Sequence, residues 1–405
     1  MPSDQYPQVE LPLDLKNIAS VMASVGYQTP YKGKWHLSKP LGADWAPADL
    51  AQYGFDRWNP PDGGANQDVD QFGGGVADND GRFMNDGDMA AGAEGVLAYL
   101  SSTAAQEQPF FLVVSLVNPH DVLSYPKEYI DGGYENADLV GPIDVPQTVD
   151  EDLGTKPSAQ ESFLRLTALG LGRLRTKQQQ RAYLNFYGNL MKRSDAYLVE
   201  VLDLLAEKDL LENTLVIQTS DHGELGLAHG GLRQKNFNVY EETMRVPLVF
   251  SNPILYQQPR QSSAMVSHVD LLPTLASLFG APAGARANWE GVDYSRIVLD
   301  PGARGVQDYV VFTYDDWQAG QKSGPYVRQP NHITSIRESR YKLAKYLDPD
   351  GDAATEWEMY DLHLDPLETK NIAGDRFPRT AQQQQELRRL KAKLATVQQR
   401  RLRPL

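Results

Sequence analysis

The stretch Thr214-Leu-Val-Ile-Gln-Thr-Ser-Asp-His-Gly-Glu224 places a polar turn directly after a short apolar run. The branched residues at 215–217 are typical of a strand buried in a parallel sheet. Open α/β sheets bind their ligands at the carboxyl ends of such strands. We therefore expect Asp221 and His222 to lie where a metal ion or an anionic substrate is held. Asp-His pairs also occur in solvated turns, so other segments are needed to decide between the two interpretations.

Two further segments carry lysine or histidine side chains at the ends of predicted strands. In Gly33-Lys-Trp-His-Leu37, Lys34 and His36 are two residues apart and share one face of an extended backbone. Such a pair suits an oxyanion that needs a positive charge and a hydroxyl that needs a hydrogen-bond partner. The apolar run 110–117 predicts another central parallel strand, and His120 lies just past its carboxyl end. Taken singly, such residues are more often a surface lysine or a structural histidine.

The composition is that of a globular chain without an excess of positive charge. Of its 405 residues, 41% are hydrophobic and 23% are charged, and the length leaves room for two to three domains. A net charge of −14 argues against non-specific binding to nucleic acid. Local cations can still hold an anionic substrate. The chain has no cysteine, which excludes disulfides and thiolate metal sites.

No feature of the sequence assigns the chain to a compartment. No run approaches the roughly 18 apolar residues of a membrane-spanning helix, so we expect no membrane span. The first ten residues have neither a basic start nor an apolar core, and we do not interpret them as a signal peptide. Any export signal would precede residue 1, and the localisation stays open.

Apolar periodicity predicts four helices and a further strand in the first three hundred residues. The helices cover Leu15–Val25, Met89–Thr103, Lys177–Asp209 and Asp270–Gly280, and the third of them carries the longest apolar stripe. The apolar run in Arg245–Ser251 predicts another buried strand. His229 is expected at the surface or behind the site rather than in it.

The last hundred residues change to short alternating segments, which predict strands over 308–314 and 332–345. A helix with a leucine stripe follows over 380–400. We therefore predict an α/β fold with a mixed, largely parallel central sheet and flanking helices. A small C-terminal antiparallel sheet with a packed helix completes it. The predicted domains are 1–301 and 302–405.

Several motifs together resemble those of the sulfatases, a family of the alkaline phosphatase superfamily. Asp-His-Gly-Glu is followed by Lys235 and by Tyr240-Glu-Glu-Thr-Met-Arg-Val-Pro-Leu-Val-Phe250, as in the second metal-binding half of these enzymes. Gly-Lys-Trp-His around Lys34, Asn-Pro-His ending at His120, and the ending 357–371 are similar to further family motifs in the same order. The resemblance covers nearly the whole chain and implies hydrolysis of a sulfate ester.

The resemblance implies roles for four residues that handle the sulfate group. Lys34 binds a sulfate oxygen, and His36 contacts the nucleophile. His120 helps to bind the ester and assists the leaving group. Lys235 bridges sulfate and leaving-group oxygens. The expected partner is therefore a small-molecule or glycan sulfate ester, with a pocket shaped by the irregular loops.

Asp221 and His222 match two ligands of the family's divalent cation, which is Ca²⁺ in the first place, with Mn²⁺ or Mg²⁺ as alternatives. Family members also carry two consecutive aspartates and a C/S-x-P-S-R motif that yields formylglycine. Neither precedes Lys34 here, so we expect an N-terminally truncated chain with no formylglycine. Because calcium takes roughly six to eight oxygen ligands, metal binding should be weak and turnover small. Loss of a central strand should also expose a sheet edge.

Two alternatives stay open. One is a phosphonate monoester or phosphodiester hydrolase of the same superfamily, because these esters present a similar tetrahedral oxyanion. The other is a non-catalytic homologue that binds an anion or a glycan. The loops expected to shape the pocket are Trp58–Asp88 and Tyr125–Lys156, whose composition is rich in Gly, Asp and Pro. The oligomeric state is not identified.

Overall fold

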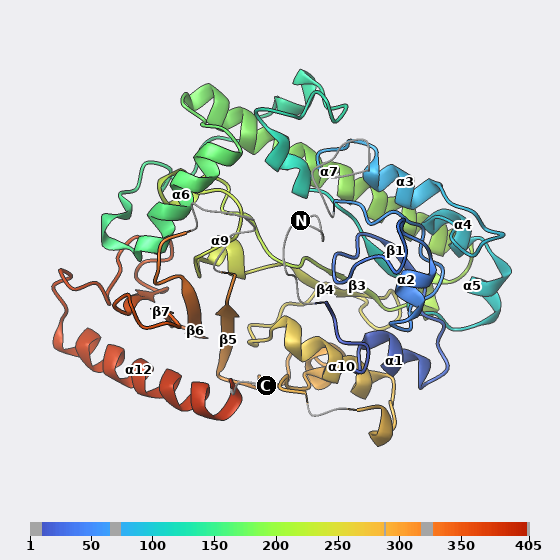
Figure 1. Ribbon diagram of the computed structural model, residues 1–405. Coiled ribbons are helices and arrows are strands. Elements are labelled where there is room, and N and C mark those ends of the chain that lie inside the picture. The colour runs from blue at the N-terminus through green and yellow to red at the C-terminus, as the bar shows by residue number, and fades with distance from the viewer. Residues whose placement is uncertain (1–9, 65–73, 287–288, 317–326, 403–405) are drawn as a thin grey trace.

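The computed structural model describes residues 10–64, 74–286, 289–316 and 327–402 (Figure 1). The helices are α1 (Ile18–Ala23), α2 (Ala48–Ala51), α3 (Asn79–Asn85), α4 (Val96–Leu100), α5 (Thr103–Glu107), α6 (Ser158–Gly170), α7 (Lys177–Glu207), α8 (Ala228–Gly231), α9 (Glu241–Met244), α10 (Leu271–Leu278), α11 (Ser295–Leu299) and α12 (Ala381–Arg401). The strands are β1 (Tyr31–Gly33), β2 (Val113–Ser115), β3 (Val216–Thr219), β4 (Leu248–Ser251), β5 (Tyr309–Tyr314), β6 (His332–Glu338), β7 (Tyr341–Leu347) and β8 (Glu356–Asp361). No helix in these ranges is long and apolar enough to cross a membrane.

The longest element is α7, which crosses the upper part of the molecule in Figure 1. It begins after Thr176, whose side chain accepts a hydrogen bond from the Gln179 N–H while the Gln179 side chain accepts one from the Thr176 N–H. This capping box satisfies N–H groups that have no partner within the helix. The helix predicted over Lys177–Asp209 is thereby confirmed. Its second half packs Val201 and Leu205 under the strands of the α/β part.

The strands of the α/β part form two separate ladders. β1 and β2 are parallel, with Tyr31 opposite Val113 and Gly33 opposite Ser115. β3 and β4 are antiparallel. The expectation of buried strands was wrong for both β3 and β4, because the last two residues of β3 and most of β4 are exposed. Each strand has a single neighbour among the described residues, so the apolar runs that predicted burial are only partly covered.

The C-terminal part forms the predicted small antiparallel sheet with a packed helix. Its four strands follow chain order, β5-β6-β7-β8. Figure 1 shows α12 lying along this sheet, and its buried side chains pack with Ile336, Leu343 and Met359. The residues of α12 that make this contact are Leu387, Leu390, Leu394 and Val397. The domain boundary between residues 301 and 302 stays a prediction.

Two local predictions were wrong. The helix expected over Met89–Thr103 is instead a pair of short helices, because Ser102 caps a new helix by accepting a hydrogen bond from the Ala105 N–H. The segment Trp58–Asp88, expected to be irregular, contains α3. There the buried Asp80 accepts hydrogen bonds from the N–H groups of Val117 and Asn118, at 2.6 and 3.1 Å.

Candidate functional site

The six predicted site residues line one cavity of about 2790 Å³. They come from four places that the fold brings together: the segment after β1, the turn after β2, the turn after β3, and the loop that precedes α9. The residues are Lys34, His36, His120, Asp221, His222 and Lys235. The carboxyl ends of β1, β2 and β3 therefore meet at one edge, as expected for an α/β ligand site.

Lys34 follows β1 and directs its ammonium group toward the cavity. Its backbone N–H donates to the Ser115 oxygen at 2.8 Å, which extends the ladder by one residue. Burial lowers the pKa of Lys34, and the positive charge of Lys235 lowers it further. Asp62, Asp221 and Asp121 oppose that shift from a distance. Within the described part of the chain, Lys34 and Lys235 form no ion pair.

His36 is held by a left-handed backbone rather than by the extended one that we expected. Its φ is 54°, a conformation that is uncommon outside glycine. The Asp62 carboxylate accepts hydrogen bonds from the N–H groups of Trp35 and His36, both at 2.7 Å. These bonds fix the turn, so the argument from alternating side chains was wrong for this pair. His36 nevertheless lines the same cavity as Lys34.

His120 stands at the start of a short 3₁₀ turn after β2, directly after the cis peptide Asn118-Pro119. Its Nδ1 lies 3.4 Å from the Asp121 carboxylate. Asp121 is fully buried and accepts hydrogen bonds from the Gly75 N–H and the Tyr134 hydroxyl, both at 2.7 Å. Burial lowers the pKa of His120; the bond to Asp121 opposes this, and the charges of both site lysines add to it. His120 is therefore neutral near pH 7.

Asp221 and His222 interact mainly with each other. The Asp221 carboxylate accepts the His222 N–H at 2.9 Å and lies 3.2 Å from His222 Nε2. The Asp221 side chain is 79% exposed. Partial loss of water around the carboxyl raises the pKa of Asp221, but the charges of His222, Lys34 and Lys235 outweigh this effect, and the net pKa is lowered. Burial lowers the pKa of His222, and Lys235 adds to that effect.

These two residues do not make a complete metal site. The described residues contain no group of three or more His, Asp or Glu side chains that could hold a metal ion. Calcium takes roughly six to eight oxygen ligands, and the single exposed carboxylate of Asp221 supplies at most two. His222 offers nitrogen, which calcium does not prefer.

Lys235 lies in a loop with several left-handed residues. Gln234 and Phe237, which flank it, have φ values of 67° and 58°. Each such residue costs about 1–3 kcal/mol and persists only where its surroundings fix it. The Glu224 carboxylate accepts the Gln234 N–H at 2.9 Å, and also accepts the Tyr183 hydroxyl of α7 at 2.8 Å. Burial lowers the pKa of Lys235, which Asp221 and Glu224 oppose.

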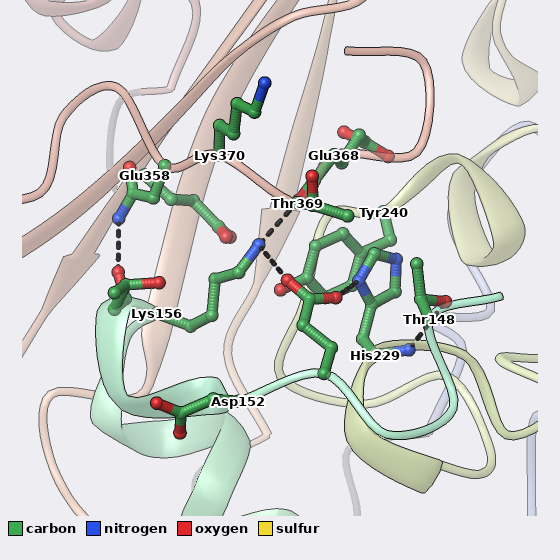
Figure 2. A network of polar contacts seen from close by, with 12 residues as sticks. Thr148, Asp152, Lys156, His229, Tyr240, Glu358, Glu368, Thr369 and Lys370 are labelled. Carbon is green, nitrogen blue, oxygen red and sulfur yellow. Dashed lines mark hydrogen bonds and ion pairs between the residues drawn. The ribbon is translucent and has the colours of Figure 1, made fainter. Parts of the chain in front are cut away.

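A buried charge network fixes the other side of this loop (Figure 2). His229 is fully buried and does not line the cavity, so of the two positions expected for it, at the surface or behind the site, it is not at the surface. Its ring stacks on Tyr240 with centroids 3.5 Å apart, and its Nδ1 lies 2.8 Å from the Glu151 carboxylate. Glu151 also pairs with the ammonium group of Lys156 at 3.0 Å. Burial lowers the pKa of His229, but Glu151 and Glu242 outweigh it, and the net pKa is raised.

The network continues into the C-terminal sheet through a second buried lysine. Lys342 on β7 pairs with Glu241 at 2.8 Å and with Glu368 at 2.6 Å. Lys156 donates to the backbone oxygen of Glu368 at 2.5 Å, which joins the two halves of the network. The loop that carries Lys235 is therefore bound to the C-terminal sheet by paired charges.

Comparison with known proteins identifies the family. A profile described as Sulfatase matches residues 1–281, and one described as N-sulphoglucosamine sulphohydrolase, C-terminal, matches residues 229–400. The chain belongs to the sulfatase family. Delta 4,5-hexuronate-2-O-sulfatase of Bacteroides thetaiotaomicron is 28% identical over 292 residues, which are 70% of this chain and 56% of that relative. The chain spans about half the length of the curated relatives it matches.

Solved structures share the fold. A protein in complex with its substrate D-glucosamine-2-N,6-O-disulfate aligns with a TM-score of 0.68 and 19% identity, covering 96% of this chain and 83% of that one. A phosphonate monoester hydrolase from Silicibacter pomeroyi aligns with a TM-score of 0.65 and 20% identity, covering 96% and 81%. At these identities the likeness shows the alkaline phosphatase-like fold alone, and the predicted fold class is confirmed.

Four acidic residues that support the site were not predicted. Asp62, Asp80, Asp121 and Glu224 each accept backbone N–H or hydroxyl hydrogen bonds that hold a turn carrying a site residue. Asp121 and Glu224 adjoin predicted site residues in the sequence, which is a usable signal. The first two belong to a Gly- and Asp-rich segment whose composition predicts only a loop.

Proposed function

We propose that this chain provides the sulfate-binding half of a sulfuric ester hydrolase site. Lys34 and Lys235 neutralise the oxygens of the sulfate group, because both line the same cavity and neither has a carboxylate partner among the residues that the structure describes. That placement is the observation that carries the proposal. Burial lowers the pKa of both lysines, because an ammonium group away from water is costly without an anion beside it. A bound sulfate group would offset that cost.

His120 and His36 complete the proposed contacts to the ester. His120 is neutral near pH 7 because burial and the two lysines lower its pKa, and a bound sulfate group would offset the charge of the lysines and favour the protonated ring. This property suits donation to the leaving-group oxygen. His36 follows Lys34 by two residues and, as the resemblance implies, would contact the attacking group. The supporting observation for His36 is its place on the cavity wall.

The chain offers less for the metal ion and for the nucleophile than for the sulfate group. A divalent cation would meet only Asp221 and His222, so we expect weak cation binding, with Ca²⁺ preferred to Mn²⁺ or Mg²⁺. The sequence holds no cysteine and no C/S-x-P-S-R motif for a formylglycine. We therefore expect binding of the sulfate group but little turnover by this chain.

The substrate class we propose is a sulfated saccharide. One relative is named for a sulfated hexuronate, and one structural neighbour holds a glucosamine disulfate. The alternative substrate is a phosphonate monoester or phosphodiester. A phosphonate monoester hydrolase with the same fold supports this alternative. A non-catalytic homologue that binds an anionic glycan remains the third candidate.

The test measures binding and turnover separately. Calorimetry should detect binding of a glucosamine sulfate, and Lys34→Met or Lys235→Met should weaken it by at least about ten-fold. Hydrolysis of 4-nitrophenyl sulfate with calcium present should stay near background, while rapid turnover would refute our expectation. Equal or tighter binding of a phenylphosphonate ester would favour the alternative, and no binding of either anion would overturn the proposal.

A further inference from the structure

The loop that carries Lys235 is held from both parts of the molecule. On the α/β side, the Glu224 carboxylate accepts the N–H of Gln234, the residue directly before Lys235. On the other side, the side-chain amide of Asn236, the residue directly after Lys235, donates a hydrogen bond of 2.7 Å to the hydroxyl of Tyr314. Tyr314 is the last residue of β5, the edge strand of the C-terminal sheet (Figure 1). Lys235 therefore lies between two neighbours that different parts of the chain fix.

Tyr314 holds this loop in two separate ways. Its hydroxyl accepts from Asn236, and its ring packs edge-on against Phe237, with the ring centroids 4.9 Å apart. Phe237 is fully buried, and its φ of 58° lies in the left-handed region. A left-handed phenylalanine is unfavourable by itself and persists only where its surroundings fix it. The rings of Tyr314 and Phe163, which both pack on Phe237, supply such surroundings.

The hydrogen bond to Tyr314 is the one that the Asn236 side chain makes within the described ranges. The other polar atom of that amide, Oδ1, is buried without a hydrogen-bond partner among these residues. The neighbouring main chain is fixed by Asn238, whose side chain donates to the backbone oxygens of Lys235 and Asn236, both at 3.1 Å. Without the Tyr314 hydroxyl, the whole Asn236 amide would be unpaired. Its turning toward water would move the backbone that it shares with Lys235.

The Tyr314 hydroxyl has a second partner, which fixes the direction of its proton. It donates to the Asp316 carboxylate at 3.3 Å. Burial raises the pKa of Tyr314, and the charge of Asp316 raises it further, so the hydroxyl stays protonated. Because the O–H donates to Asp316, the lone pairs of the oxygen are left for the Asn236 amide.

We propose that Tyr314 is a positioning residue for Lys235: the hydrogen bond between its hydroxyl and Asn236 fixes where the ammonium group of Lys235 lies in the cavity. Tyr314 does not itself line that cavity, so it acts through the loop and not by touching an anion. Only the binding assay below rests on the function proposed above, because the position of Lys235 can be measured without any anion.

The first experiment follows the Lys235 side chain by NMR in a chain with isotope-labelled lysines. Its Cε signal is assigned by its loss in Lys235→Arg. Tyr314→Phe keeps the ring and removes the hydroxyl, so this signal should move toward the common position of the exposed lysines. The signal of the buried Lys342 on β7, assigned with Lys342→Arg, should stay constant and show that the C-terminal sheet is intact.

Tyr309→Phe is the matched control. Tyr309 is the first residue of β5, and its ring contacts Lys393 of α12 rather than the loop. Removing its hydroxyl should leave both the Lys235 signal and anion binding unchanged. Asn236→Ala removes the same contact from the side of the loop, and should displace the Lys235 signal as Tyr314→Phe does. This second variant keeps the test valid if Tyr314→Phe does not fold.

The second experiment is a double-mutant cycle on anion binding. In calorimetry with a glucosamine sulfate, Tyr314→Phe should weaken binding roughly three- to ten-fold. In the Lys235→Met background the same change should have no further effect, because it acts through that lysine. In the Lys34→Met background its full effect should remain. A general loss of structure would instead weaken binding in both backgrounds.

Two outcomes would overturn the proposal. One is a Lys235 signal that neither Tyr314→Phe nor Asn236→Ala moves. The other is an equal loss of affinity on Tyr314→Phe in the Lys235→Met and Lys34→Met backgrounds. A chain without substitutions that binds no anion would refute the function proposed above. If its Lys235 signal still depends on Tyr314, the positioning role stands, so the two failures are distinguishable.

Discussion

Two pairs of lysines in this molecule have opposite surroundings. Lys156 and Lys342, beside the C-terminal sheet, are buried and paired with carboxylates at 3.0 Å or less. Lys34 and Lys235, in the cavity, have no ion-pair partner in the described part of the chain. The first pair is neutralised by the chain itself and stabilises the fold. The second pair has no such partner, and under the function proposed above an anion from outside would neutralise it.

Breaking the paired set should have the largest effect. Lys342→Met removes the cation of the buried Glu368, while the partly buried Glu241 keeps Arg337 at 3.0 Å, and the change should destabilise the chain by about 3–5 kcal/mol. Urea denaturation followed by tryptophan fluorescence measures this. A loss of stability below about 1 kcal/mol would mean that the ion pairs of Lys342 contribute no more than surface ion pairs. The proposed difference between the two pairs of lysines would then be wrong.

The pH dependence of stability should report on the same buried charge network around Lys342. Burial raises the pKa of Glu368 to about 7 from its ordinary 4.5. The folded state therefore holds a proton between pH 4.5 and 7 that the unfolded state has lost, and stability falls as the pH rises through that window. The raised pKa of His229 acts in the same direction above pH 6.5. We expect a loss of about 1–3 kcal/mol between pH 5 and pH 8.

Denaturation of Glu368→Gln at both pH values is the control for that prediction. The variant should lose most of the pH-dependent fall, while Glu386→Gln on α12, where the carboxylate pairs with Arg389, should keep it. An unchanged fall in Glu368→Gln would assign the effect to another group.

Removing an unpaired lysine should act on binding and not on stability. Lys34→Met replaces a poorly solvated charge by an apolar side chain, so the free energy of unfolding should stay constant or rise by up to about 1 kcal/mol. Sulfate affinity should fall in the same variant. A destabilised Lys34→Met would mean that this lysine supports the fold and would break the comparison.

Removing an exposed ion pair should have the smallest effect on stability, and it serves as the reference for the other variants. Lys177 pairs with Asp150 at 2.8 Å on the surface, with side chains 47% and 78% exposed. Lys177→Met should change the free energy of unfolding by about 0–0.5 kcal/mol in the same denaturation experiment. A change above about 1 kcal/mol would show that exposure is a poor guide to ion-pair strength in this chain.

The sequence predicted elements better than it predicted their surroundings. The stripe in α7 and the leucines of α12 define helices by themselves, because periodicity is local. The apolar residues of β3 predicted a strand correctly but not its burial or pairing, since both depend on which strand lies beside it. Short helices such as α3 depend on distant hydrogen bonds to Asp80 and were missed.

For the site, residue types at strand ends together with the resemblance to the sulfatases named six residues that share a cavity. The residues that hold them were not predictable in the same way. His229 meets Glu151 and Glu242, which lie 78 and 13 residues away in the chain, and no local pattern connects them. The left-handed backbone of His36 likewise depends on Asp62, a residue 26 positions later.

The continuous helix α7 has a consequence for which parts of the chain can change length. Its first turns carry Tyr183, bonded to Glu224 beside the cavity, and its last turns carry Leu205 under β2 and β3. One inserted residue would rotate everything beyond it by about 100° and shift it by about 1.5 Å. The two ends could then no longer keep both contacts. Insertions and deletions during evolution should therefore gather in loops such as 125–156, while α7 keeps a fixed length.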